Sequence, residues 1–288
     1  MPEPKNQAIR IIKYFLFSAS IMAALLGGAM AYGAGAFDPT RFILALLGLF
    51  IGQAGGDYLY YWGTHFRGES RDSHTKIFAG WKPLFTGTLL EPKNTLYAGI
   101  ACLAIDILIA GYFVMQLGSA VIPLALAGGL VAIFFTPLML AGYKEPVIFV
   151  TFGPLAVESV YFAITGDFEI SPLIASLPIA FFVTVVAYLK GAHFEVSGSG
   201  DDSVVLKLDR TRITWLYLAG FAALAAVILL GHAPAWSALG FVPAPVALKV
   251  LTSIRKETNK VSDYLWAVVS SLVFFILSGI LICLGFII

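Results

Sequence analysis

Charged residues are scarce in this chain of 288 residues, because Asp, Glu, Lys and Arg together make up only 12% of it. The formal net charge is +1, so the basic surface typical of nucleic-acid binding proteins is missing and no nucleic-acid partner is expected. Cysteine is also rare. Cys102 and Cys283 stand in apolar runs without metal-type spacing, so neither a disulfide nor a cysteine metal site is expected.

Apolar residues are abundant instead. They make up 59% of the chain, against roughly 45–50% in ordinary globular proteins, and the mean hydropathy is +0.88. Apolar stretches of about 20 residues recur along the chain, each long enough to cross a hydrocarbon core of ~30 Å. No stretch has the small-residue cleavage site of a removable signal peptide. The sequence predicts an all-α, polytopic protein of the cell membrane, with residues 1–288 forming one domain.

The apolar pattern predicts nine transmembrane helices. Their expected ranges are 10–33, 40–64, 95–116, 119–140, 145–165, 171–190, 213–231, 236–254 and 263–287. Cations gather in every second connector, and Arg41 alone falls on the cation-poor side. The positive-inside rule therefore predicts a cytoplasmic N-terminus and a C-terminus outside.

The two long loops, about residues 65–94 and 191–212, each follow an even-numbered span and so lie on the cytoplasmic face. This layout predicts two half-sites that meet over a central cavity. Interrupted spans also favour a cavity, because the freed backbone groups need neighbouring helices or water. The prolines that predict such interruptions are Pro137, Pro154, Pro178, Pro243 and Pro245.

Three acids lie inside apolar spans, where an ionised carboxylate costs about 2.5–3.5 kcal/mol even on the lenient insertion scale. Asp57 is interpreted either as a metal ligand at a cavity mouth or as a helix-end acid paired with a cation. Asp106 is interpreted as a helix–helix hydrogen-bonding group or as a functional acid. Glu158, one turn from Tyr161, belongs either to the cavity wall or to helix packing.

The stretch 53–87 is the densest polar segment of the chain. Its cations suit an anionic head group, because Arg and Lys donate charge-assisted hydrogen bonds to phosphate. A diphosphate usually also needs Mg²⁺ held by carboxylates, which Asp57, Glu69 and Asp72 can supply. The alternative is a basic connector that contacts anionic lipid. The predicted diphosphate-binding residues are Arg67, Arg71, Lys76 and Lys82.

Aromatic residues precede this loop. Tyr58, Tyr60, Tyr61 and Trp62 form either an interfacial belt or a cavity wall whose ring faces stabilise an allylic cation. The second loop offers His193, Glu195, Asp201 and Asp202 as a second half-site. The alternative there is a solvated acidic turn.

Three stretches carry a resemblance to a known family. QAGGDYLYYWGTHFRGES looks like an acidic N-D-Y-x-D-Y motif, KPLFTGTL looks like a K/R-P-L-x-[ST]-G segment, and YKEPVIFVTFGPLAVESVYFAITG is similar to an E-x-x-V-F-x-F-F-G-P helix. Together they resemble the UbiA superfamily of intramembrane prenyltransferases, most closely the branch that prenylates 1,4-dihydroxy-2-naphthoate in menaquinone synthesis.

The resemblance implies a reaction and a site. A polyprenyl diphosphate binds through Mg²⁺, the diphosphate leaves, and the allylic cation alkylates a lipophilic, aromatic acceptor. Asp57 matches the first motif with Gln53 in place of Asn, whereas Tyr60 or Tyr61 and His65 stand where the family has acids. The implied catalytic residues are Asp57, Tyr61 and His65. The implied Mg²⁺ ligands are Asp57, Asp72, Glu195, Asp201 and Asp202, and the implied cavity residues are Gln53, Tyr60, Glu158, Tyr161 and His193.

Two other functions stay open. A UbiA-like protein without transfer activity would bind or move an isoprenoid or an anionic lipid. An ion-coupled transporter would use Asp106 and Glu158, but it would need paired broken helices in two matching halves, which the sequence does not display.

Overall fold

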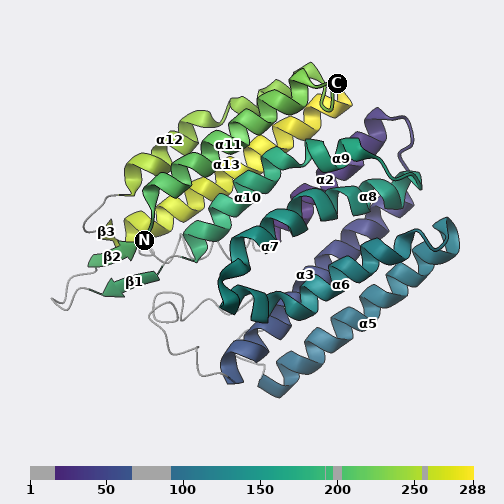
Figure 1. Cartoon of the computed structure of the whole chain (residues 1–288), viewed down its shortest axis with the longest axis horizontal. Helices are drawn as coiled ribbons and strands as arrows, with labels where there is room; N and C mark the ends of the chain where they lie inside the picture. Colours follow the sequence, from purple (N-terminus) through teal and green to yellow (C-terminus); the bar gives the residue numbers. More distant parts are fainter. Residues whose placement is uncertain (1–16, 67–91, 192, 197–202, 255–258) are drawn as a thin grey trace, which may run out of the picture.

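The computed structural model describes residues 17–66, 92–191, 193–196, 203–254 and 259–288. Over these residues the chain forms long helices lying side by side, with a small sheet at one end (Figure 1). Several of the helices are apolar and long, as expected of a multi-pass integral membrane protein. The helical elements are α2 (Ser18–Gly33), α3 (Pro39–Phe66), α5 (Pro92–Leu117), α6 (Val121–Leu138), η2 (Met139–Tyr143), α7 (Lys144–Val150), η3 (Thr151–Leu155), α8 (Ala156–Thr165), α9 (Ile170–Ala175), α10 (Leu177–Lys190), α11 (Arg210–Leu229), η4 (Ala235–Phe241), α12 (Ala244–Ser253) and α13 (Val261–Ile287).

Within the described ranges, seven helical segments are long and apolar enough to cross a membrane, and α2 is a shorter apolar helix. One of the seven, Val121–Thr165, has 45 residues. A straight helix of that length would span about 68 Å, more than twice the ~30 Å hydrocarbon core. The segment is not straight, because Gly142 has φ 88°, a left-handed conformation that favours glycine. The nine crossings and the orientation of the termini stay predictions.

Most of the predicted proline interruptions coincide with breaks in the helices. Pro154 lies in η3, where the neighbouring Gly153 has non-helical angles of φ −103° and ψ −109°. Pro178 stands at the start of α10, directly after α9, and Pro243 and Pro245 stand at the start of α12. Pro137 lies within α6, just before η2. Proline is tolerated in the first turn of a helix, where its missing N–H would have no partner, and removes a hydrogen bond in the helix interior, so these prolines mark where helices begin or bend.

The helices form two groups joined through α2 and through contacts of α7 and η3 with α10. On one side α3 packs against α5 and α6; on the other, α10 packs against α11 and α13 (Figure 1). Helix α2 contacts α3, α8 and α13. Phe182, Tyr217, Phe221 and Phe274 hold the second group together through edge-to-face ring pairs with centroids 4.8–5.7 Å apart, a geometry that adds to the burial of their rings.

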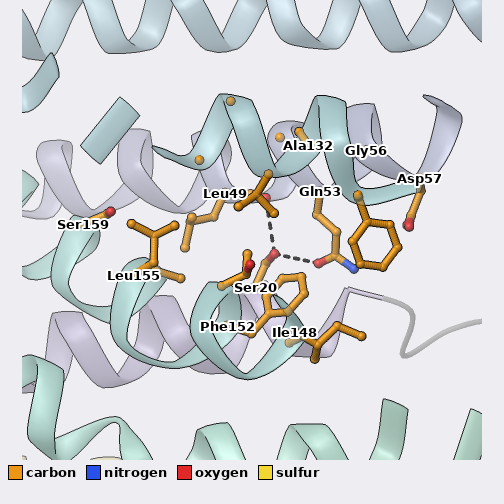
Figure 2. A pocket seen from close by; sticks show the side chains of 18 of the residues that line it. Ser20, Leu49, Gln53, Gly56, Asp57, Ala132, Ile148, Phe152, Leu155 and Ser159 are labelled. Carbon is orange, nitrogen blue, oxygen red and sulfur yellow. Dashed lines mark hydrogen bonds between the residues drawn. The ribbon is translucent and has the colours of Figure 1, made fainter. Parts of the chain in front are cut away.

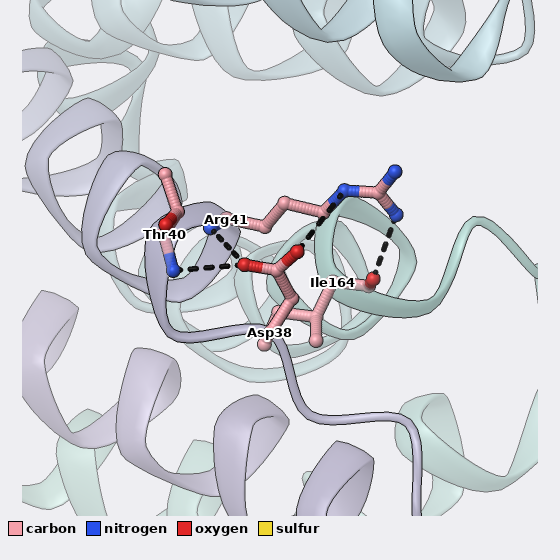
Figure 3. A network of polar contacts seen from close by, with 4 residues as sticks. All are labelled: Asp38, Thr40, Arg41 and Ile164. Atoms are coloured by element: carbon pink, nitrogen blue, oxygen red, sulfur yellow. Dashed lines mark hydrogen bonds and ion pairs between the residues drawn. The ribbon is translucent and has the colours of Figure 1, made fainter.

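A polar network fixes the start of α3 (Figure 3). Asp38 Oδ1 accepts hydrogen bonds from the backbone N–H groups of Thr40 (2.8 Å) and Arg41 (3.0 Å), which would otherwise have no partner in the first helical turn. Arg41 lies 3.9 Å from Asp38 and donates at 3.0 Å to the carbonyl of Ile164 near the end of α8. Arg41, the cation that lies in a cation-poor connector, therefore joins the start of α3 to the end of α8.

The loop predicted over residues 191–212 contains two strands, β1 (His193–Val196) and β2 (Ser203–Lys207). They pair antiparallel, with His193 opposite Lys207 and Glu195 opposite Val205, and β2 also pairs with β3 (Asn259–Lys260). The all-α prediction therefore holds for the membrane helices and misses this small sheet. Its signal was the alternation of apolar and polar residues in HFEV, which has the period of a strand.

The contact between α2 and α8 yields a stability prediction. A Cβ on Gly27 would lie 2.7 Å from the carbonyl oxygen of Val157 and 3.0 Å from Val160 Cβ, whereas a Cβ on Gly111 would meet nothing within 4 Å. We expect Gly27→Ala to lower the free energy of unfolding by ~1–3 kcal/mol through overpacking. Gly111→Ala adds a better helix former in open space and should keep or raise stability. Thermal unfolding of the purified variants measures both, and equal midpoints would contradict the close packing of α2 on α8.

Candidate functional site

A cavity of about 1550 Å³ lies between the two groups of helices. It is lined by residues of α2, α3, α5, α6, η2, α7, η3, α8, α10 and α13. Figure 2 labels lining residues of α2, α3, α6, α7, η3 and α8. This exceeds the ~300–1,000 Å³ of ordinary small-molecule pockets. Most of its lining is apolar, including Leu103, Ile107, Phe113, Ile148 and Phe152. A cavity of this size and character suits a long apolar ligand.

Polar side chains gather where α3 and α10 end and α7 begins; we call this the polar end of the cavity. Tyrosine, carboxylate and ammonium groups from three helices meet there. Its residues are Asp57, Tyr60, Tyr61, Lys144, Glu145, Tyr188 and Lys190. The sequence placed these residues in separate spans and connectors, and the fold brings them to one place.

Asp57 and Lys190 interact across the polar end. Each contributes to the electrostatic environment of the other, from α3 and α10 respectively. Asp57 Oδ2 is nevertheless buried with no hydrogen-bond partner among the residues that the structure describes. Buried polar atoms are normally paired, so this oxygen is available to a ligand of the cavity.

Lys144 brings a second positive charge to the polar end. Its Nζ donates a hydrogen bond at 3.0 Å to the carbonyl of Ala187 in the last turn of α10. It also lies close enough to Lys190 for the two positive charges to interact. A Cβ on Gly191 would collide with this ammonium group, so glycine leaves the space it occupies. An ammonium has three N–H donors, so the bond to Ala187 leaves others for an anion.

The start of α11 closes the rim of the polar end. Arg212 lies 3.9 Å from Glu145, and its guanidinium carbon sits 4.8 Å from the centre of the Tyr188 ring. Tyr188 Oη accepts a hydrogen bond from the backbone N–H of Asp209 at 3.1 Å. These contacts join α7, α10 and α11 around the two lysines, and so hold the cationic groups in a fixed arrangement.

Further along α3, Ser20 and Gln53 form a polar contact within the cavity (Figure 2). The single hydrogen of the Ser20 hydroxyl is donated to Gln53 Oε1 at 2.6 Å, and the carbonyl of Leu49 is a second acceptor at 3.2 Å. The bond fixes the Gln53 side chain and ties α2 to α3. Gln53 therefore lines the cavity with its orientation set by another helix.

Several predicted site residues lie outside the described residues: Arg67, Arg71, Asp72, Lys76, Lys82, Asp201 and Asp202. For three others only the backbone is described. His65 lies in the last turn of α3, and His193 and Glu195 lie in β1. Of the five predicted Mg²⁺ ligands, only Asp57 has a described side chain.

Glu158 and Tyr161 are not among the residues that line this cavity; for Glu158 the contacts favour the alternative of helix packing, and Tyr161 lines a smaller pocket of about 310 Å³. Glu158 is 0% exposed, and its Oε1 accepts from the backbone N–H of Glu169 at 3.2 Å. The Tyr161 hydroxyl donates to Glu169 Oε1 at 2.8 Å. Their neighbours Ser159 and Val160 face the cavity instead. One residue is a turn of about 100° around a helix, so Glu158 and Tyr161 join the contacts between α8 and α9.

Lys144 and Lys190 were not among the site residues predicted from the sequence; both belong to the cations that gather in every second connector. Both stand at the boundary of a predicted span, where a lysine is expected on the positive-inside rule alone. Only the break at Gly142 and the end of α10 turn them toward the same cavity. A glycine two residues before Lys144 was the one available signal that the helix stops there.

The described side chains contain no group of three or more His, Cys, Asp or Glu residues that could hold a metal ion. Asp57, with its unpartnered oxygen, fits the role of a single carboxylate ligand. The described part of the site thus combines two ammonium groups with the carboxylates of Asp57 and Glu145, and these acids alone do not make a complete metal centre.

Comparison with known proteins gives two relatives. The UbiA prenyltransferase domain-containing protein 1 of Gallus gallus is 27% identical over 175 residues, which cover 57% of this chain and 50% of the relative. Its counterpart in Xenopus tropicalis is 26% identical over 175 residues, or 57% and 48% of the two chains. The match spans about half the length of these curated relatives. No family model matches the chain. The two relatives support the UbiA superfamily, and they do not distinguish the naphthoate branch.

The interaction between Asp57 and Lys190 yields a prediction for stability. Lys190→Met leaves the Asp57 carboxylate buried without its cation, and such a loss costs about 3–5 kcal/mol in a buried pair. We expect Asp57→Asn combined with Lys190→Met to recover a large part of that loss. Thermal unfolding of the single and double variants measures the coupling.

Lys249→Met is the matched control, because Lys249 is exposed on α12 and lies outside the cavity lining. Its effect should stay within about 0.5 kcal/mol. Additive effects of Asp57→Asn and Lys190→Met would show that the two charges do not interact.

Proposed function

We propose that this chain is a membrane prenyltransferase that moves a polyprenyl group from its diphosphate to a lipophilic, aromatic acceptor. The observation that carries the proposal is the shape and polarity of the large cavity between the helices. Two lysines and a buried carboxylate stand at its polar end, and an apolar wall extends from them between the helices. A polyprenyl diphosphate has the same division into a charged head and a long apolar tail.

The two lysines would bind the diphosphate and stabilise the charge that develops as it leaves. The allylic carbon–oxygen bond breaks, and its electron pair goes to the diphosphate. Ammonium groups fixed in a water-poor site stabilise such a charge strongly, because they need no reorganisation during the reaction. Lys144 is fixed by its bond to Ala187, and Lys190 by its interaction with Asp57.

The aromatic residues of α3 would stabilise the allylic cation. Tyr60 and Tyr61 both line the cavity at the polar end, and Tyr60 also packs edge-on against Phe135 with ring centroids 6.2 Å apart. The face of an aromatic ring attracts a cation. A ring carbon of the acceptor then bonds to the allylic carbon, and the ring loses one proton, which the released diphosphate accepts.

Mg²⁺ would add positive charge at the leaving diphosphate when bound. Asp57 is the described residue that fits as a ligand, and the other proposed ligands are Asp72, Glu195, Asp201 and Asp202. The naphthoate branch, the cytoplasmic position of the polar end and the cell membrane as location belong to the same proposal. The positive-inside pattern of the sequence supports the cytoplasmic side.

A second candidate function is binding or transport of an isoprenoid or anionic lipid without transfer. The observation that favours it is that tyrosines, Tyr60 and Tyr61, occupy the place where the UbiA superfamily has an acidic residue. Their rings lie 5.5 Å apart in an edge-on pair within the cavity wall. Such a pair contacts an apolar chain well but supplies no carboxylate for a metal.

A transfer assay tests the proposal. We would incubate the purified full chain with labelled geranylgeranyl diphosphate, Mg²⁺ and a panel of quinone precursors and glycerol-phosphate lipids. Diphosphate release with a prenylated product is the expected result. Tight, Mg²⁺-independent binding without turnover would overturn the transferase and favour the second candidate.

Lys144→Met and Lys190→Met probe the proposed role of the two ammonium groups. Each removes a charged hydrogen-bond donor to the diphosphate, and we expect the turnover rate to fall by about 10–100-fold. Lys249→Met removes an equal charge on the surface and should leave the rate unchanged. An unaltered rate in both cavity variants would remove the lysines from the mechanism.

A further inference from the structure

Asp106 is an acid in the middle of α5 that the proposed transfer step does not use. It lines the same cavity as Asp57 but lies against a different part of α3. A Cβ on Gly52 would come within 2.8 Å of Asp106 Oδ2, and a Cβ on Gly48 would lie 3.4 Å from Oδ1. Two glycines one turn apart on α3 therefore make the space that the carboxyl group occupies.

The Asp106 carboxyl group has no hydrogen bond or ion pair to any other residue in the part of the chain that the structure describes. The cavity residues next to it in sequence are Leu103, Ile107 and Ala110, which carry no polar side-chain atom. A carboxyl group inside a membrane helix normally pairs with another group or marks a functional site. The sequence allowed two interpretations of Asp106, and one of them was a hydrogen bond between helices. No described residue provides the partner for that bond.

The polar groups of the cavity occur at two levels. Asp106 faces Gly52, and Asp57 follows Gly52 by five residues on α3. At 1.5 Å per residue, the two levels are about 7.5 Å apart along α3. The polar end holds the charged groups suited to a diphosphate, and the Asp106 level holds one acceptor among apolar walls. The separation of about 7.5 Å between the two levels is similar to the length of a small ring system.

We infer that Asp106 accepts a hydrogen bond from a ring hydroxyl of the aromatic acceptor and so positions that ring in the cavity. This inference rests on the proposed function and adds a residue that selects the acceptor. A prenyl tail has no donor to satisfy the carboxyl group. A metal ion would need further ligands, and no cluster of three such side chains exists among the described residues. A hydroxylated ring offers both the donor and the apolar faces that the surrounding walls require.

Among the described residues that line the cavity, Asp106 carries the one carboxyl group that lies away from the polar end. The Ser20 hydroxyl donates to Gln53, and Lys144 donates to Ala187. Thr151 Oγ1 also lines the cavity without a partner among the described residues, but a carboxylate accepts a stronger hydrogen bond than a hydroxyl, so Asp106 is the stronger acceptor for a bound ring. A site built to bind a hydroxyl rejects an analogue without it, because its polar group is then buried unpaired.

A binding experiment on the purified full chain tests the inference without turnover. The probes are 1,4-dihydroxynaphthalene and 1,4-dimethoxynaphthalene, which share the ring system and differ in the hydroxyl donors. We expect the wild-type chain to bind the dihydroxy probe about tenfold more tightly or better, the factor for one hydrogen bond to a charged group. Asp106→Leu should abolish this preference, and Asp106→Asn should reduce it.

Asp263→Asn is the matched control, because Asp263 is an exposed acid in the first turn of α13 and does not line the cavity. It should retain the full preference for the dihydroxy probe. Binding of geranylgeranyl diphosphate should be the same in all these variants, since the polar end is intact. A variant with lost diphosphate binding would be misfolded, and Asp106→Asn, which keeps the size of the side chain, then decides the result.

The outcomes separate this inference from the proposed function. A wild-type preference that persists in Asp106→Leu and Asp106→Asn overturns the inference, even if the chain transfers prenyl groups. Absence of any preference in the wild-type chain overturns it as well. A preference that Asp106→Leu abolishes supports the hydroxyl site, even if the transfer assay yields no product and the proposed function fails.

Discussion

The constraint on which the rest of the structure depends is that a polar group within the bilayer must find its partner inside the protein. The helices satisfy this for the backbone, and the breaks between them occur where other contacts replace the helical bonds. The carbonyl of Ile164 near the end of α8 receives a hydrogen bond from Arg41, and the carbonyl of Ala187 near the end of α10 receives one from Lys144. Cations from other helices thus stabilise helix ends that proline, glycine and tight turns create.

The same constraint distinguishes structural polar side chains from functional ones. In the tightly packed group of helices, the hydroxyls of Tyr264 and Ser278 donate to the carbonyls of Leu189 and Gly240 at 2.7 Å. The buried polar atoms without a partner among the described residues are Asp57 Oδ2, Thr151 Oγ1 and Glu158 Oε2. Asp57 and Thr151 line the cavity. The exceptions to the rule therefore concentrate where a ligand would supply the missing bond.

The sequence predicted what depends on hydropathy and on single residues, and missed what depends on how helices meet. Apolar runs located the helices, and Pro154 and Pro178 located breaks, because both effects act locally. The roles of Lys144 and Lys190 depend on the ends of α7 and α10 arriving at one place, which no local pattern encodes. Glu158 differs from its neighbour Ser159 only by a rotation around α8, which decides which of them faces the cavity. The N-cap role of Asp38 before α3 is local too, but Arg41 beside it reaches a residue 123 positions away.

The two groups of helices differ in how tightly they are packed. This difference matters for a cavity that has both a polar end and an apolar wall. In the apolar segments Ile170–Lys190, which contains α10, and Asp263–Ile287, which lies in α13, 67% and 61% of the residues in the most apolar stretch are buried. The shares are 11% in α5 and 6% in the segment that begins with α6. The well-packed group supplies Lys190, which in the proposed transfer would need a fixed position to stabilise the developing charge. The loosely packed group supplies the apolar wall, including Leu126 and Leu130, which remain more than half exposed although they line the cavity. An apolar chain needs contact area more than exact placement, so a thin wall of large aliphatic side chains serves it. Precision is required only where α3, α7 and α10 bring their charged ends together.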